Sequence, residues 1–167
     1  MASSFQLRPF LEKDQESVSR HANNRKIWAG VRDHFPHPYT LEDAAAFIKM
    51  AQEEEDAVVK AIVVEGQAVG AIGIHPQEDV HRICVEIGYW LGEEYWGMGI
   101  TTEAVKEMTQ LAFELGYTRV FATVFGNNPA SQKVLEKAGY NYEGIMKSAA
   151  LKDGQILDVW MYGIVSL

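Results

Sequence analysis

The sequence predicts one α/β domain built around a mixed, mostly antiparallel sheet, and three observations support this. Short β-branched and apolar runs alternate with amphipathic helical segments along the 167 residues. Two of these runs are joined by the short turn Glu65-Gly66-Gln67, which is typical of an antiparallel hairpin. No linker, internal repeat or low-complexity segment divides the sequence, so a single domain over 1–167 is expected.

The first half of the chain is predicted to alternate strand and helix before the hairpin. Proline ends the opening strand, Asp14 is placed to cap the first helix, and Thr40 is placed to cap the second. Aromatic, proline and histidine residues fill the segment between these helices, which is expected to be an irregular loop. The predicted elements are a strand over 5–10, a helix over 14–22, the loop over 27–39, a helix after Thr40, and strands over 58–64 and 69–74.

The second half begins with an apolar strand that ends near Leu91. Apolar residues then recur at helical spacing from Ile100 to Leu115, and Gly116 ends that helix. Lys152-Asp153-Gly154 supplies a turn between the last two strands. The remaining predicted elements are a strand over 119–125, a helix over 129–138, and strands over about 140–150 and 156–165.

Composition excludes several classes of function. The hydrophobic share of 47% and the charged share of 23% are those of a soluble globular protein. A net charge of −8 argues against nucleic acid or an anionic membrane as the partner. The single cysteine, Cys84, cannot form a disulfide framework, and no signal-like start or membrane-spanning run is seen, so a cytoplasmic location is expected.

A glycine turn between strand and helix is the strongest local signal. Gly97 and Gly99 permit a tight turn, and the helix that follows begins with unpaired N–H groups at the positive end of its dipole. Such a turn can bind an anion, most naturally a phosphate. Taken alone it could equally be an ordinary helix entry. It is not a Walker loop, because no Gly-Lys-Ser/Thr follows the glycines. It is also not the Gly-x-Gly-x-x-Gly dinucleotide fingerprint, because Thr102 stands at the third glycine position.

Three sequence blocks, at 32–40, 86–104 and 128–140, together resemble the GNAT superfamily of N-acetyltransferases in its RimJ/RimL-like branch. The middle block holds Glu-Ile-Gly-Tyr-Trp-Leu followed by Trp-Gly-Met-Gly-Ile-Thr-Thr-Glu-Ala, and the last begins Asn-Pro-Ala-Ser. The resemblance implies about seven strands flanked by about four helices. It also implies that the strands at 85–91 and 119–125 are parallel and splay apart to hold acyl-CoA.

The resemblance implies acetyl-CoA as the cofactor and places it on the glycine turn and the neighbouring strand. Three positions depart from the family. Trp96 stands where the family usually has Gln or Arg, Met98 where it often has a basic residue, and Thr101 where it usually has Gly or Ala. Backbone donors survive all three changes. Lys133 and Lys137 are candidates for the 3′-phosphate, or are ordinary surface lysines. The implied cofactor-binding residues are Tyr89, Trp90, Leu91, Gly97, Met98, Gly99, Ile100, Thr101, Thr102, Asn128, Ser131, Lys133 and Lys137.

Direct acetyl transfer to an amine in a ternary complex needs a base, because an amine with a pKa near 10.4 is protonated at pH 7. Glu86, a carboxylate inside an apolar strand, is the candidate base; the alternative is a glutamate that merely faces water. Ser131 is the candidate proton donor to the thiolate, and it also fits a capping motif with Asn128. Leu135 stands where many family members have a tyrosine acid. Tyr140 or Tyr142 could substitute, although packing explains both.

The acceptor side is expected to combine the loop with the last strand. The candidate substrate-binding residues are Trp28, Arg32, His34, Phe35, Tyr39 and Asp158, with core packing as the alternative for the aromatic ones. No metal is expected, because no carboxylate or thiol cluster accompanies His34 and His37.

The acceptor is expected to be a primary amine, either a protein N-terminus such as that of a ribosomal protein or a small amine or polyamine. The alternatives are a non-catalytic acyl-CoA-binding regulatory domain and a transferase that uses another thioester such as succinyl-CoA. Nucleotide binding is remote, because no Gly-Lys-Ser/Thr follows the glycines. A homodimer is expected by analogy alone.

Overall fold

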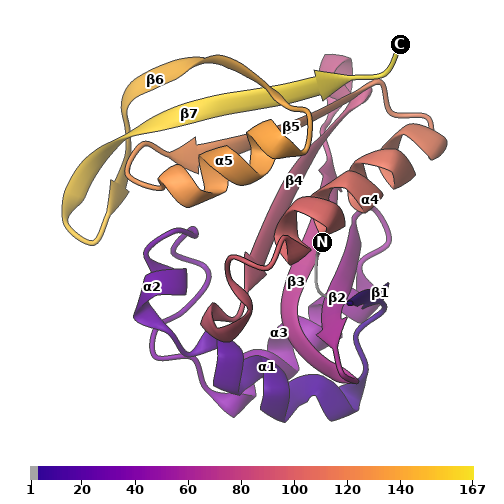
Figure 1. Cartoon of the computed structure of the whole chain (residues 1–167), viewed down its shortest axis with the longest axis vertical. Helices are drawn as coiled ribbons and strands as arrows, with labels where there is room; N and C mark the ends of the chain where they lie inside the picture. Colours follow the sequence, from indigo (N-terminus) through magenta and orange to yellow (C-terminus); the bar gives the residue numbers. More distant parts are fainter. Residues whose placement is uncertain (1–3) are drawn as a thin grey trace.

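The chain forms a seven-stranded sheet that carries helices on both faces (Figure 1). The computed structural model describes residues 4–167. The strand order is β1-β2-β3-β4-β5-β7-β6, and every neighbouring pair is antiparallel except β4 and β5. The elements are β1 (Gln6–Arg8), η1 (Glu12–Asp14), α1 (Gln15–Ala22), α2 (Arg25–Trp28), α3 (Leu41–Glu53), β2 (Val58–Val64), β3 (Gln67–Pro76), η2 (Asp79–His81), β4 (Cys84–Leu91), η3 (Glu93–Tyr95), α4 (Ile100–Glu114), β5 (Arg119–Phe125), α5 (Pro129–Lys137), β6 (Asn141–Lys152) and β7 (Gln155–Val165).

This architecture confirms the predicted fold class and element order. It adds a fifth α-helix, α2, at the start of the segment expected to be irregular. The Asn24 side chain accepts a hydrogen bond from the Lys26 N–H at 2.8 Å and so caps this short helix. Asp14 does not cap α1 as expected. Its carboxylate instead accepts bonds from the Arg8 guanidinium at 2.7 and 2.9 Å and from the Leu11 N–H at 2.8 Å.

The parallel strands β4 and β5 separate in the middle of the sheet. They pair directly at three positions, which match residues 84–86 of β4 to 119–121 of β5. Beyond Glu86 the two strands diverge, although β4 continues to Leu91 and β5 to Phe125. Each keeps its antiparallel partner on the other side, β3 for β4 and β7 for β5. The splayed pair that the family resemblance implied is therefore present.

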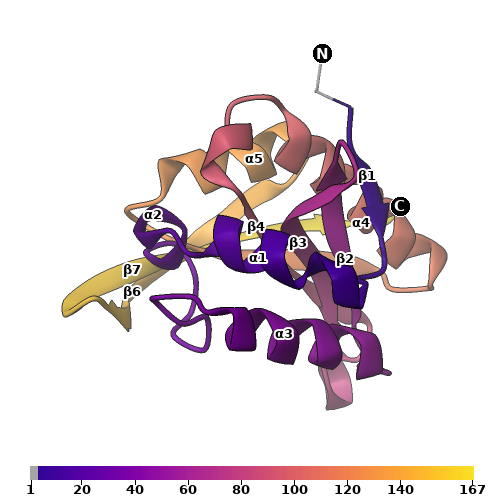
Figure 2. The ribbon, with the colours of Figure 1, turned by 90° about the horizontal axis from the view of Figure 1, so that it is seen from below.

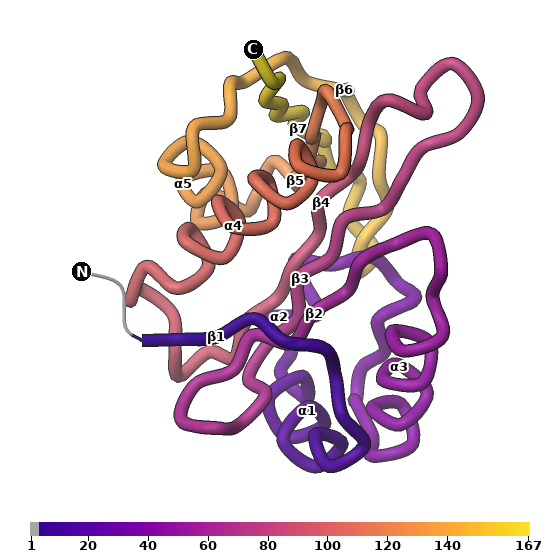
Figure 3. Tube along the Cα trace, turned by 90° about the vertical axis from the view of Figure 1, so that its right-hand side faces the viewer, coloured from indigo at the N-terminus to yellow at the C-terminus, as the bar shows by residue number. Residues whose placement is uncertain are grey.

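Two apolar cores, one on each face of the sheet, hold the helices in place (Figures 2 and 3). The core under α4 and α5 includes the fully buried Met108, Leu135 and Tyr162. The core under α1 and α3 includes the fully buried Val18 and Ile48. Burial of each such side chain contributes about 1.5–3 kcal/mol. The sheet is thus held rigidly on both sides of the point where β4 and β5 diverge.

The long β6–β7 hairpin reaches across the molecule and ends beside α2 (Figure 1). Its turn is built on Asp153 and Gly154, both of which have positive φ. No helix in residues 4–167 has the length and hydropathy needed to cross a bilayer.

Candidate functional site

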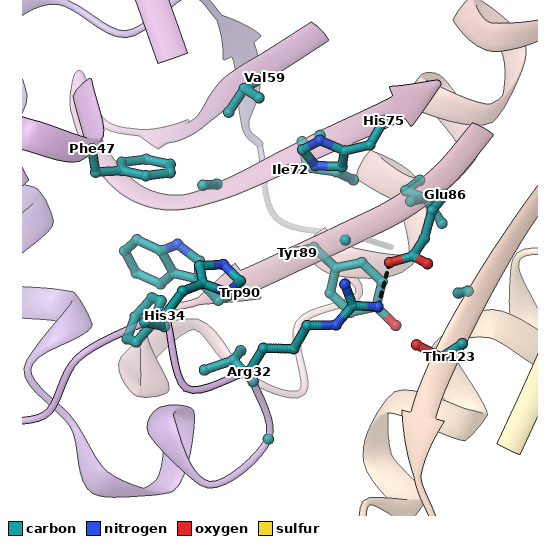
Figure 4. Close-up of a pocket in the computed structure, with 18 of the residues that line it drawn as sticks. Arg32, His34, Phe47, Val59, Ile72, His75, Glu86, Tyr89, Trp90 and Thr123 are labelled. Carbon is teal, nitrogen blue, oxygen red and sulfur yellow. Dashed lines mark hydrogen bonds and ion pairs between the residues drawn. The ribbon is translucent and has the colours of Figure 1, made fainter. Parts of the chain in front are cut away.

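A cleft of about 880 Å³ opens where β4 and β5 diverge (Figure 4). Residues 86–90 of β4 line one wall and residues 122–125 of β5 line the other, while α3 and the 30–39 loop close one end. Gly88 faces open space, since a Cβ placed there would meet no heavy atom within 4 Å. The cleft therefore has room for an extended ligand between the two strands.

The glycine turn at the end of β4 prepares the start of α4 for an anion. Gly97 and Gly99 have φ values of 73° and 79°, a left-handed conformation that glycine adopts without strain. Gly99 is the N-cap of α4, and no side chain caps its first N–H groups. The Trp96 indole N–H donates to the Leu91 carbonyl at 2.7 Å. Trp96, which departs from the family pattern, thus fixes the turn to the strand end and leaves the backbone donors free for a phosphate.

Tyr89 and Ser131 meet in the cleft, one from β4 and the other from α5. Their hydroxyls share a hydrogen bond of 2.7 Å. Burial raises the pKa of Tyr89 to about 12, although the bond from Ser131 acts in the opposite direction. The Tyr89 hydroxyl therefore keeps its proton at physiological pH. Asn128 caps α5 as expected by accepting from the Ser131 N–H at 3.3 Å, and so positions Ser131.

Glu86 lies where the two strands part and forms an ion pair with Arg32 from the loop. The Arg32 Nη2 to Glu86 Oε1 distance is 2.7 Å (Figure 4). Glu86 is largely shielded, with 23% of its side chain exposed, whereas 60% of the Arg32 side chain is exposed. The carboxylate thus faces the cleft while Arg32 reaches it from the solvent side.

His75 is the register partner of Glu86 across β3 and β4 and lines the same part of the cleft. His75 is exposed to solvent, and the protein packed around it still lowers its pKa by desolvation, which Glu86 opposes. The imidazole is therefore neutral at pH 7 and can accept or donate a hydrogen bond. Sequence reasoning missed His75, because only the strand register shows that it neighbours Glu86.

The other end of the cleft is apolar and aromatic. Phe35 packs against Tyr39 and Trp90 with ring centroids 4.9 and 5.8 Å apart. Phe47 from α3 and Val59 from β2 complete this wall (Figure 4). Phe47 was not among the expected site residues, since its helical spacing resembles that of the apolar stripe of α3. The cleft thus has a charged end and an apolar end.

The expected acceptor residues separate into two groups. Arg32, His34, Phe35 and Tyr39 line the cleft. Trp28 lies outside it, stacked on the Lys152 ammonium at 3.9 Å. Asp158 also lies outside it, where its carboxylate accepts from the Ser148 N–H at 2.9 Å and from Lys147 at 3.3 Å. Trp28 thus contacts the β6–β7 hairpin, and Asp158 bonds within that hairpin. The spacing of these residues in the sequence does not reveal either contact.

The remaining expected cofactor residues and alternative acids have defined places. Leu91 is buried in the core, and Lys133 and Lys137 are exposed on α5. Tyr140 is buried and shares a 2.6 Å hydrogen bond with Thr109. Tyr142 packs against Trp160 and Tyr162 on the hairpin. Neither tyrosine lines the cleft, so Tyr89, named above only for cofactor binding, is the tyrosine beside Ser131.

Known proteins share both the sequence pattern and the fold. The family model described as an acetyltransferase (GNAT) domain matches residues 5–141. The uncharacterized N-acetyltransferase YoaA of Bacillus subtilis (strain 168) is 34% identical over 100 residues, which are 59% of this chain and 56% of that protein. The L-amino acid N-acetyltransferase AaaT of Escherichia coli (strain K12) is 29% identical over 154 residues, which are 87% of this chain and 95% of that protein.

Among solved structures, Mycobacterium smegmatis RimJ in complex with CoA-disulfide superposes with a TM-score of 0.87 at 23% sequence identity. The superposition covers 97% of this chain and 82% of that chain. At this identity the likeness establishes the fold. Several curated relatives, YoaA among them, are matched over only about half of their own length.

Proposed function

The chain belongs to the GNAT acetyltransferase family, and on that premise we propose that it is an acetyl-CoA-dependent N-acetyltransferase. One observation supports this most directly. The divergence of β4 and β5 opens a cleft lined by a carboxylate and a hydroxyl pair, and the glycine turn follows the end of the β4 wall in the chain. The known complex of RimJ with a CoA disulfide agrees with a CoA ligand in this fold.

The residues present fit acetyl-CoA. The N–H groups of residues 97–101 would hold its pyrophosphate, and the open space at Gly88 would admit its pantetheine arm. Asn128 would orient that arm, and Lys133 and Lys137 are the candidates for its 3′-phosphate. When bound, acetyl-CoA supplies a thioester whose acetyl group can move to an amine.

Glu86 would accept the proton that the acceptor ammonium loses before its nitrogen attacks. Ser131 would donate a proton to the departing sulfur and receive one from Tyr89 through their shared hydrogen bond. The second proton that the acceptor nitrogen releases on forming the amide would return to Tyr89 through solvent. A thiol with a pKa near 8.5 leaves readily, so this acid has the less demanding role. The cleft walls would hold amine and thioester close together. No protein nucleophile is needed, which agrees with the burial of Cys84.

The acceptor is a primary amine. The RimJ/RimL-like resemblance favours a protein N-terminal amine, whereas the relative AaaT is named for transfer to L-amino acids. A small amine is therefore the other class to test.

Melting curves with acetyl-CoA, CoA, succinyl-CoA and ATP test this proposal. A ligand at about 100 times its Kd adds roughly 2.7 kcal/mol, which raises the Tm of a domain this size by several degrees. Acetyl-CoA and CoA should give this rise and ATP should not. A larger rise with succinyl-CoA would change the donor, and no rise with any thioester would refute the proposal.

Turnover separates an enzyme from a binding domain. Thiol release from acetyl-CoA with a panel of amines and peptides should be measured for the wild type, Glu86→Gln and Ser131→Ala. Both variants should keep the acetyl-CoA-induced rise in Tm while their turnover falls. If the wild type binds acetyl-CoA but acetylates no amine, the chain is a non-catalytic binding domain.

A further inference from the structure

We propose that the acceptor is a free α-amino acid with an apolar or aromatic side chain, bound by insertion of its ammonium and carboxylate between Glu86 and Arg32. This inference rests on the proposed acetyltransferase function and specifies its acceptor. It starts from the ion pair at the charged end of the cleft, which joins the candidate base to a cation from a different element.

The ion pair is placed so that a ligand can open it. Arg32 lies on a loop and is 60% exposed, so its pairing with Glu86 is of the surface kind that contributes about 0–1 kcal/mol. An ammonium that reaches Glu86 must displace the guanidinium, which then needs a new anion. An α-amino acid carries that anion on the same carbon as its amine. It therefore replaces one ion pair with two.

The other charged groups of the cleft do not favour a polyamine. The Asp43 carboxylate is committed to the cap of α3, where it accepts from the Thr40 N–H at 2.8 Å and from the Thr40 hydroxyl at 2.9 Å. His75 is neutral at pH 7, since desolvation lowers its pKa. Glu86, whose partner Arg32 a ligand can displace, is therefore the carboxylate offered to an ammonium at the charged end of the cleft, and Arg32 is the cation there. A compound with several ammonium groups would find one carboxylate and would leave Arg32 unpaired.

A protein N-terminus would also leave Arg32 without an anion when its ammonium binds Glu86. Its α-carbon carries an amide in place of a carboxylate, so displaced Arg32 would gain a neutral carbonyl at most. A carboxylate accepts two parallel hydrogen bonds from an Arg guanidinium and pairs with its charge, whereas a single amide carbonyl oxygen offers neither the second acceptor nor the negative charge. Arg32 would thus discriminate between a free amino acid and a peptide.

The apolar end of the cleft would receive the amino acid side chain. Phe47, Val59 and Trp90 lie beyond the ion pair (Figure 4). Phe35 packs against Trp90 and belongs to the same wall. These residues come from the loop, α3, β2 and β4, so the wall is built from four separate elements. Such a wall favours leucine, methionine or phenylalanine over glutamate or lysine.

A matched substrate series tests the inference. The kcat/KM for acetylation should be measured with L-phenylalanine, L-phenylalaninamide, 2-phenylethylamine, spermidine and a peptide with N-terminal phenylalanine. We expect L-phenylalanine to exceed its amide and its decarboxylated amine at least about tenfold, because a site built for a polar group discriminates against analogues that lack it.

Variants identify the residue responsible. Arg32→Gln should abolish the preference for L-phenylalanine over its amide, mainly through a higher KM, and Arg32→Lys should restore part of it. Arg82→Gln is the matched control, since Arg82 is exposed on the turn between β3 and β4, does not line the cleft, and donates to the Asp79 carbonyl at 2.9 Å. Phe47→Ala should lower kcat/KM for L-phenylalanine more than for L-alanine.

The outcomes separate this inference from the proposed function. Acetylation of the peptide or spermidine at rates equal to or above L-phenylalanine would refute the amino-acid acceptor and leave the acetyltransferase standing. An unchanged preference in Arg32→Gln would refute the role of Arg32. Absence of transfer to every amine in the series would refute both.

Discussion

At the scale of single residues, we propose that the hydrogen-bonded hydroxyls of Tyr89 and Ser131 take the place of the tyrosine acid that is absent at position 135. Leu135 is fully buried in the core, and Tyr140 is engaged with Thr109. Tyr89 has a pKa of about 12 and therefore stays protonated throughout the range of an assay. We expect Tyr89→Phe and Ser131→Ala each to lower kcat about 10- to 100-fold, which is at or below the smallest rate factors typical of general acid catalysis.

Steady-state thiol release measures this effect, and the acetyl-CoA-induced rise in Tm checks that binding survives. The double variant should lose little more than the worse single variant, because the two hydroxyls act as one unit. Fully additive losses would show that they act separately.

His21 is a second residue whose environment makes a prediction. It is 5% exposed, and burial lowers its pKa, as does Arg20, while Glu94 opposes both. The native protein therefore holds His21 neutral, and the unfolded chain binds a proton near pH 6.5. Above about pH 6.5 His21 is neutral in both the native and the unfolded states, so its protonation does not favour unfolding. As the pH falls from there to the native pKa of His21, the unfolded chain alone binds the proton and the free energy of unfolding decreases.

Melting curves between pH 8 and pH 5 measure that loss. His21→Gln should be less stable at pH 8, and its Tm should fall less steeply below pH 6.5 than that of the wild type. The exposed His81→Gln should retain the wild-type slope. Equal slopes in all three proteins would exclude His21 as the source.

At the scale of elements, the divergence of β4 and β5 predicts the effect of filling the gap. A side chain at Gly88 meets open space, so Gly88→Val should change stability by no more than about 0.5 kcal/mol. The same side chain would occupy the path proposed for the pantetheine arm. We expect the acetyl-CoA-induced rise in Tm to be lost in Gly88→Val and reduced in Gly88→Ala. A full rise in Gly88→Val would place the ligand elsewhere.

The hairpin and the acceptor loop form a second pairing of elements. Lys152 is 3% exposed, lies 3.9 Å from the Trp28 ring centroid, and pairs with Asp33 at 2.9 Å. Asp33 precedes His34 and follows Arg32, so the hairpin supports the loop that lines the cleft. Lys152→Met keeps the apolar stem and removes the charge.

We expect Lys152→Met to lose about 1 kcal/mol of stability from the cation–π contact and the ion pair, and to raise the KM for the acceptor. Chemical denaturation and acceptor kinetics measure these effects. Lys147→Met is the control, because Lys147 lies on the same hairpin, is exposed, and pairs with Asp158 at 3.3 Å, so its loss should matter less. An unchanged acceptor KM in Lys152→Met would show that the loop holds its shape without the hairpin.

Elements were predictable from sequence because their signals are local. Periodicity located β2 and β5 to the residue, and Thr40 correctly marked the start of α3. The site was predictable only where a motif is contiguous, as in the glycine turn. The Arg32–Glu86 contact joins residues 54 apart, and the Lys152–Asp33 contact joins residues 119 apart. No spacing rule encodes such contacts, which depend on strand order and loop path.

At the scale of the whole molecule, the expected homodimer stays a prediction. Light scattering during gel filtration measures it directly, against a monomer mass of 18.7 kDa. If the mass is that of a dimer, the exposed Leu151 and Ile156 near the hairpin turn are residues to substitute in search of the interface.

The divergence of β4 and β5 has one more consequence, for hydrogen exchange. A sheet normally has two outer edges, but this one also has two inner edges, along residues 87–91 and 122–125. The amide and carbonyl groups that point toward this gap have no strand partner there, and the amide groups of a pantetheine arm could pair with them. Deuterium uptake at these amides should therefore slow when such an arm enters the gap. Slower uptake along both inner edges would show that the bound molecule takes the place of a strand between β4 and β5.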